Sequence, residues 1–199
     1  MFNEVLFANR TAAEVTSKFA HVCQGLADLR HPNITQFLGV CFVQDHPLPV
    51  IVTEKLEGSL HSLLATVANI PMTLKQSLLE DVTRGLHYLH TYNPPITYGA
   101  LTARNVLYNS SLVAKISDIC NNHLVQFQSR QLAQTLTLET LSYLPEDAAT
   151  QSSPKTDVFS LGHLALFTLT QVSVLMTNST QGSVMCSNFN DFPQSGNLF

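Results

Sequence analysis

The chain has 199 residues, of which 45% are hydrophobic and only 12% are charged, and its formal net charge at pH 7 is −4. This length supports one domain with a buried core, and the composition excludes a highly charged disordered chain. With 10 Lys and Arg residues against 14 Asp and Glu residues, the chain lacks the positive excess typical of proteins that bind nucleic acid or an anionic membrane surface.

The cysteines and the N-terminus are typical of a cytoplasmic protein. The four cysteines are far apart and form no CxxC pair, so the sequence predicts reduced thiols rather than a disulfide framework or a zinc site. The first ten residues, MFNEVLFANR, contain no positive stretch followed by an apolar run, which is the pattern of a signal peptide.

The first part of the chain predicts a small sheet and one helix. Apolar residues recur at three- and four-residue spacing before His31-Pro32, and the residue before a proline disfavours helical geometry, so a helix should end there. The expected elements are a strand at 1–8, a helix at 13–30, and strands at 34–43 and 49–55 joined by a turn at 44–47.

The middle of the chain predicts two helices and a hairpin. Gly58-Ser59 should open a short helix that runs to about residue 68. Residues 73–92 form the clearest helical pattern, with Thr73 as the expected N-cap and an apolar stripe along one face. Short strands are expected at 105–108 and 113–117, with residues 109–111 as the turn between them.

The last part of the chain combines a long loop, an apolar segment and a polar end. Residues 119–142 lack periodicity and predict a long loop. Residues 157–176 are strongly apolar but contain too many polar side chains for a membrane span, which favours a helix buried on all sides. Residues 177–199 are rich in Asn, Ser, Gln and Gly and predict a poorly ordered tail.

Six sequence blocks, in this order, resemble the protein kinase family, nearer its tyrosine-kinase-like branch. They are LRHPNITQFLGVC (29–41), IVTEKLEGSLHSLL (51–64), ITYGALTARNVLYN (96–109), AKISDICNN (114–122), YLPED (143–147) and SPKTDVFSLGHLALFTL (153–169). The resemblance implies an α+β, protein-kinase-like fold. It implies an incomplete N-lobe at 1–56, a partial and mainly helical C-lobe at 57–170, and a poorly ordered tail at 171–199.

The resemblance also shows which parts of the ATP-binding machinery are missing. The family's phosphate-covering glycine-rich loop would lie before Met1. Its ATP-binding lysine falls near Phe7, and the glutamate that pairs with that lysine falls at Val22. Neither position carries a charge, so the grip on the nucleotide phosphates should be lost.

The catalytic loop departs from the family in the same way. The family's His-Arg-Asp triplet becomes Tyr98-Gly99-Ala100, and Ala100 has no oxygen to accept the proton of a substrate hydroxyl. Arg104 is retained beside it. The resemblance therefore implies that no catalytic residue of this loop is intact.

Two candidate metal ligands and three candidate nucleotide-lining residues remain. Asn105 and Asp118 match the family's metal ligands and have oxygen atoms suited to Mg²⁺ or Mn²⁺, although both residue types are also common in plain turns. Thr53, Glu54 and Leu56 match the segment that lines the adenine site. The resemblance implies at most weak binding of ATP with Mg²⁺ or Mn²⁺.

The other retained residues have structural roles in the family. Asp157 matches an aspartate that accepts hydrogen bonds from the catalytic loop, and Pro145-Glu146 matches the end of the activation segment. His87 and His90 lie near a helix end, where a lone pair of histidines is more often a surface feature than a metal site.

Three hypotheses follow for the function. The favoured one is a pseudokinase, a kinase-like domain without phosphate transfer that binds other signalling proteins or another kinase. The alternatives are an ATP-dependent protein kinase and a non-functional fragment of one. We expect neither a nucleic-acid partner nor a membrane-spanning segment.

Overall fold

The computed structural model describes residues 23–41, 50–99, 101–119, 153–176 and 184–188. Residues 23–28 are helical, which agrees with the end of the helix expected at 13–30. The strand expected at 1–8, the turn at 44–47 and the loop at 120–142 lie outside the described residues.

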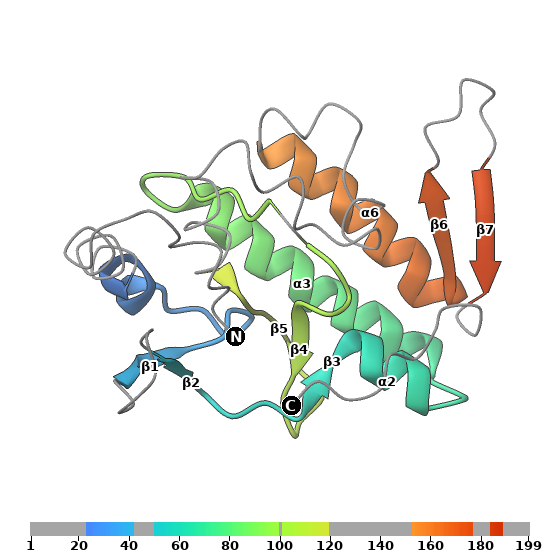
Figure 1. Cartoon of the computed structure of the whole chain (residues 1–199), viewed down its shortest axis with the longest axis horizontal. Coiled ribbons are helices and arrows are strands. Elements are labelled where there is room, and N and C mark those ends of the chain that lie inside the picture. The colour runs from blue at the N-terminus through green and yellow to red at the C-terminus, as the bar shows by residue number, and fades with distance from the viewer. Residues whose placement is uncertain (1–22, 42–49, 100, 120–152, 177–183, 189–199) are drawn as a thin grey trace, which may run out of the picture.

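Two long helices lie side by side and organise the fold (Figure 1). They are α3 (Met72–Thr91) and α6 (Pro154–Thr170), and a small sheet packs against α3 from the other side. The sheet has the order β3-β4-β5, from Gly58–Ser59, Val106–Tyr108 and Ala114–Ile116, and all its strands are antiparallel. The hydrophobic core gathers between these elements and is completed by α2 (Leu60–Thr66).

A second sheet joins the two strands expected at 34–43 and 49–55. β1 (Phe37–Cys41) pairs antiparallel with β2 (Val50–Thr53), and the register shifts between Phe37 and Gly39. β1 begins later than predicted, because Ile34 forms a bridge with Ile116 and the Thr35 N–H donates to the Ile116 carbonyl instead. β2 ends at Thr53, two residues before the predicted end.

The short helix α2 begins where the sequence predicts. Ser59 is its N-cap and forms a capping box with Ser62, in which each side chain accepts the backbone N–H of the other. This arrangement satisfies two of the N–H groups that a helix start leaves free.

The apolar stripe of α3 is confirmed, but its predicted N-cap is wrong. Leu78, Val82, Leu86 and Leu89 are at most 3% exposed. The helix begins at Met72 after Pro71, and Thr73 lies inside it. The backbone N–H groups of Leu74 and Lys75 bond the Pro71 carbonyl, so the first turn closes without a side-chain cap.

The hairpin of β4 and β5 also forms as expected. Asn109 shapes its turn, because its side-chain oxygen accepts the N–H groups of Ser111 and Val113 at 3.0 Å each. Leu112 takes a positive φ of 58°, which completes the tight return of the chain.

Helix α6 is not buried on all sides, so that prediction is wrong. It begins at Pro154 after the Ser153 N-cap and ends at Thr170. One face packs toward α3, whereas Val158 and Leu166 on the other face are 59% and 41% exposed. The sequence misled here because an apolar helix that has no charge after its first turn looks the same whether one or both of its faces are covered.

The region predicted as a poorly ordered tail contains two strands. β6 (Val172–Met176) pairs antiparallel along its full length with β7 (Val184–Asn188). The segment expected to be helical over 157–176 is therefore helical only as far as Thr170. The β-branched residues Val172, Val174 and Val184 favour extended backbone.

Across the described ranges, the helices are too short or too polar to cross a membrane.

Candidate functional site

The buried carboxylate of Asp157, at the start of α6, holds the loop that precedes β4. Asp157 is 0% exposed, and it accepts hydrogen bonds from the backbone N–H of Tyr98 at 2.8 Å and of Gly99 at 2.6 Å. His90, at the end of α3, contacts the same carboxylate through Nε2 at 2.8 Å. One side chain thus joins α3, α6 and the loop.

His90 is a site residue that sequence reasoning missed. Its partner is a carboxylate 67 positions away, and its side chain is 17% exposed. The spacing of His87 and His90 suggested only a metal pair or a surface feature. Among the residues that the structure describes, no group of three His, Cys, Asp or Glu side chains is placed to hold a metal ion.

Tyr98 connects this loop to the segment that carries Asp118. The tyrosine is 0% exposed, and its hydroxyl donates to the carbonyl of Ser117 at 2.8 Å. Next to it, Gly99 has a φ of 81°, a conformation that glycine adopts without steric cost. Ile119 is buried beyond Asp118, at 5% exposure, so an apolar residue fills that position.

A backbone hydrogen bond joins the segments that carry the two candidate metal ligands, Asn105 and Asp118. The N–H of Ser117, next to Asp118, donates to the carbonyl of Asn105 at 2.9 Å. Asp118 has a φ of 56° and is exposed, while Asn105 is half-buried and Arg104 is exposed.

The surroundings of Asp118 shift the pKa of its carboxyl. Desolvation by the surrounding protein raises the pKa of the Asp118 carboxyl above its usual range. Because the side chain is exposed, solvent screening limits what this shift contributes to stability.

The three candidate nucleotide-lining residues lie where β2 leads into β3. Glu54 is engaged on both sides, since its Oε1 accepts the Gln36 N–H and the Lys115 ammonium at 2.8 Å each. Thr53 is exposed and Leu56 is half-buried. The Lys115–Glu54 ion pair, which links β5 to the end of β2, is a second contact that sequence reasoning missed.

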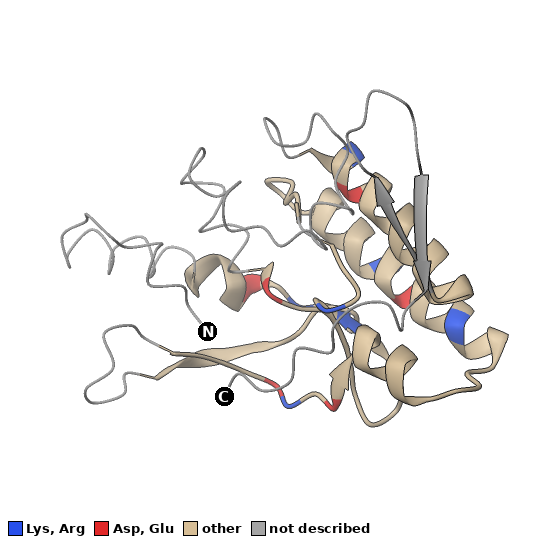
Figure 2. Cartoon of the chain, turned by 45° about the vertical axis from the view of Figure 1, so that its right-hand side comes forward, with Lys and Arg blue, Asp and Glu red and all other residues tan. Residues whose placement is uncertain are grey.

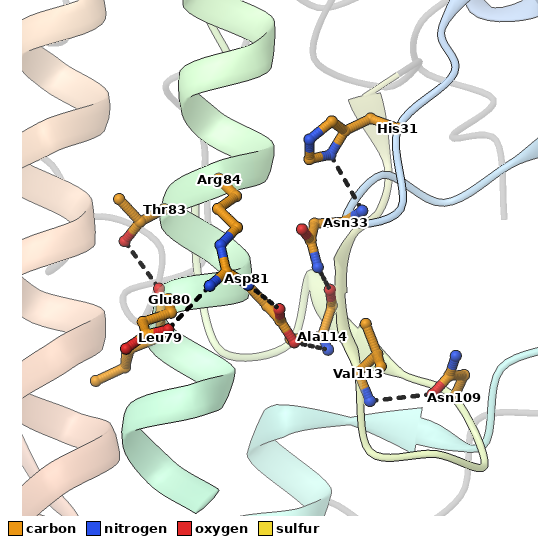
Figure 3. A network of polar contacts seen from close by, with 10 residues as sticks. All are labelled: His31, Asn33, Leu79, Glu80, Asp81, Thr83, Arg84, Asn109, Val113 and Ala114. Atoms are coloured by element: carbon orange, nitrogen blue, oxygen red, sulfur yellow. Dashed lines mark hydrogen bonds and ion pairs between the residues drawn. The ribbon is translucent and has the colours of Figure 1, made fainter. Parts of the chain in front are cut away.

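A polar network fixes the turn before β1 to α3 and β5 (Figure 3). Asn33 is 2% exposed, and its side-chain amide donates to the Ala114 carbonyl at 3.0 Å. The Ala114 N–H donates to Asp81 on α3 at 2.9 Å, and Asp81 in turn pairs with Arg84 at 3.3 Å. His31 accepts the Asn33 N–H through Nδ1 at 3.1 Å.

The His31 contact predicts a pH-dependent stability. Desolvation and, second, the charge of Lys115 lower the pKa of His31 from its ordinary 6.5. The unfolded chain therefore binds a proton more readily, and the contribution of His31 should be complete above pH 6.5 and decline as the pH falls below it. We expect the melting temperature to drop less between pH 7.5 and pH 5 in His31→Asn, which keeps an acceptor but does not titrate. An equal drop in both proteins would contradict this.

Three predicted site residues lie outside the described residues. They are Ala100, between Gly99 and Leu101, and Pro145 and Glu146 in the region that follows Ile119. Their identities are known from the sequence, and their proposed roles stay predictions.

The comparison with family models decides to which family this fold belongs. The family model for protein tyrosine and serine/threonine kinases matches residues 5–186. The chain belongs to the protein kinase family. This kinase domain has an α+β fold, as the sequence predicted.

Three curated relatives of this domain that are named as kinases come from three different organisms. A probable serine/threonine-protein kinase of Dictyostelium discoideum is 30% identical over 80% of this chain and 16% of its own length. Interleukin-1 receptor-associated kinase 1 of Bos taurus is 32% identical over 78% of this chain and 23% of its own length. Serine/threonine-protein kinase VIK of Arabidopsis thaliana is 35% identical over 65% of this chain and 30% of its own length. The chain thus spans less than a third of each of these relatives.

Proposed function

We propose that this kinase domain is a pseudokinase that acts in the cytoplasm by binding other signalling proteins. The observation that carries the proposal is the contrast at one loop. Asp157 still grips the backbone of Tyr98 and Gly99. The next residue, where the family has its catalytic aspartate, is Ala100. The framework that positions a catalytic base is kept, and the base is gone.

The size of the losses supports inactivity over a slow enzyme. A positioned general base contributes about 10²–10⁴ in rate. A preorganised charge that stabilises the transition state contributes about 10²–10³ more. The positions of the family's base, lysine and glutamate are Ala100, Phe7 and Val22, none of which supplies a proton acceptor or a charge.

Nucleotide binding should be weak at most. Asn105 and Asp118 would hold Mg²⁺ or Mn²⁺ through two side-chain oxygens, and phosphate and water would have to supply the remaining ligands. The metal would neutralise phosphate charge. We place the domain nearer the tyrosine-kinase-like branch on its Thr-Ala-Arg-Asn run at 102–105.

Thermal shift and phosphate transfer test the proposal together. We expect millimolar ATP with Mg²⁺ or Mn²⁺ to leave the melting temperature nearly unchanged, because the nucleotide should bind weakly at most. A ligand present at 100 times its Kd would instead stabilise the domain by about 2.7 kcal/mol. We also expect no phosphate incorporation above that of Asp118→Ala, the matched control. Turnover in the parent chain that Asp118→Ala abolishes would establish the alternative, an active kinase.

The active kinase remains the second candidate, because Asn105 and Asp118 are present and the curated relatives are named as kinases. The third reading, a non-functional fragment, makes a different prediction. A fragment without a stable fold should melt without a cooperative transition, whereas the buried core around α3 predicts a single sharp one.

A further inference from the structure

β1 and β2 form a two-stranded ribbon that extends away from α3 and α6 (Figure 1). We call these two strands together the ribbon. Among the labelled elements, the strands of the ribbon contact mainly each other. The linker that joins the ribbon to β3 carries charged residues (Figure 2), and they are Glu54, Lys55 and Glu57. The position of the ribbon therefore depends on how the chain is held where it enters and where it leaves.

The entry to the ribbon is attached to β5 by hydrogen bonds between neutral groups. The Thr35 N–H donates to the Ile116 carbonyl, and the Ile116 N–H donates to the Asn33 carbonyl, at 2.9 Å each. The side-chain amide of Asn33 adds a third bond, to the Ala114 carbonyl at 3.0 Å. The attachment at the entry thus does not depend on charge.

The exit from the ribbon is attached to β5 by an ion pair. Glu54 follows β2, and its Oε1 accepts the Gln36 N–H and the Lys115 ammonium at 2.8 Å each. The Glu54 N–H returns a bond to the Gln36 carbonyl at 3.0 Å, which closes the base of the ribbon. Three residues later, the Glu57 N–H donates to the Tyr108 carbonyl of β4 at 2.9 Å. One ammonium group therefore holds the carboxylate on which the exit depends.

The alternation of β5 directs Lys115 away from the core. Ala114 and Ile116, on either side of it, are 0% exposed and belong to the hydrophobic core. Because successive side chains of a strand point to opposite faces, Lys115 lies on the other face of β5. Desolvation and, second, the charge of Lys115 lower the pKa of His31, so the ammonium also lies close to the turn before β1.

The Lys115–Glu54 pair is partly shielded from water. Its side chains are 12% and 26% exposed, whereas those of the Arg84–Glu80 pair on α3 are 62% and 66% exposed. Salt and water screen a shielded pair less than an exposed one. The Lys115–Glu54 pair should therefore hold its two elements together more strongly than a surface ion pair would.

We propose that the Lys115–Glu54 ion pair is a latch that holds the exit of the ribbon on β5, and that the ribbon swings about its entry when the pair opens. The segment from Thr53 to Leu56 moves with the exit. The latch therefore sets the position of the candidate nucleotide-lining residues without a bound nucleotide. The inference goes beyond the proposed function, since it concerns the conformation of the free domain and holds whether or not the domain transfers phosphate.

Amide hydrogen exchange of the full chain without nucleotide, followed residue by residue by NMR, tests the latch. The exit set of N–H groups is Gln36, Glu54 and Glu57, and the entry set is Thr35 and Ile116. In Lys115→Met, the exit set should exchange faster by about fivefold or more, because local opening of the exit becomes more frequent. The entry set should be unchanged. Equal acceleration of both sets would mean that the substitution loosens β5 as a whole, and either that result or no acceleration at all would overturn the latch.

Three further variants separate the charge from the bulk of the side chain. Lys115→Arg keeps the cation and should leave the exit set as in the parent chain. Lys55→Met is the matched control, because Lys55 is an exposed lysine on the linker itself, and it should change neither set. Glu54→Gln keeps an oxygen for the Gln36 N–H but removes the charge, so it should accelerate the exit set as Lys115→Met does.

The double variant Glu54→Gln with Lys115→Met decides whether the two residues act as a pair. Residues that act through one shared contact have effects that do not add. The double variant should therefore exchange no faster at the exit set than either single variant. Acceleration by the product of the two single effects would mean that each residue acts alone, and the ion pair would not be the latch.

Discussion

Replacing Asp157 with alanine should destabilise the kinase domain by about 3–5 kcal/mol, the usual effect of removing one partner from a buried charged contact. Its carboxylate is 0% exposed and accepts the N–H groups of Tyr98 and Gly99 as well as His90. Without it, two backbone donors remain in the interior with no acceptor, and each such group costs about 1–3 kcal/mol. The free energy of unfolding in urea measures the loss.

Asp157→Asn separates shape from charge. The amide has the same size but only one acceptor oxygen, so it should recover part of the stability and leave one of the bonds to Tyr98 N, Gly99 N or His90 unmade. Glu80→Gln is the control, because Glu80 forms an exposed ion pair with Arg84 and such pairs contribute about 0–1 kcal/mol. If Asp157→Ala cost no more than Glu80→Gln, Asp157 would not be the anchor of the loop.

The local features of the fold were largely predictable from the sequence. The stripe of Leu78, Val82 and Leu86 follows from helical periodicity, and Ser59 follows from the chemistry of helix caps. Each depends on residues within a few positions of one another. The prediction of Thr73 as an N-cap is wrong, because the preference of threonine for N-caps is only statistical. The carbonyl of Pro71 closes the first turn instead.

The site depends on contacts that cross the chain. His90 meets Asp157 across 67 positions, and Lys115 meets Glu54 across 61. Neither contact can be recognised from the spacing or the composition of a single sequence. Only the resemblance to kinases suggested a role for Asp157, and it gave no warning that one face of α6 is exposed. That exposure depends on which elements surround the helix, and these cannot be inferred from the periodicity of the helix itself.

Gly85→Ala should destabilise the domain by about 1–3 kcal/mol, the usual effect of adding a methyl group to a filled interior. A Cβ at Gly85, on the buried face of α3, would lie 2.7 Å from the Asn33 carbonyl oxygen, which is backbone and cannot swing aside. That oxygen accepts the Ile116 N–H at 2.9 Å, and Asn33 also holds Ala114. Relieving the clash would therefore strain the link between the turn before β1 and β5. Urea unfolding measures the effect.

The matched control for this variant is Gly25→Ala, in the helical segment 23–28. A Cβ at Gly25 meets nothing within 4 Å, so alanine should stabilise there by up to about 1 kcal/mol through helix propensity alone. The same propensity acts at Gly85, and opposite signs at the two glycines would isolate the contact with Asn33. Equal stabilisation at both would mean that α3 and the Asn33 turn are not packed as closely as the 2.7 Å approach requires.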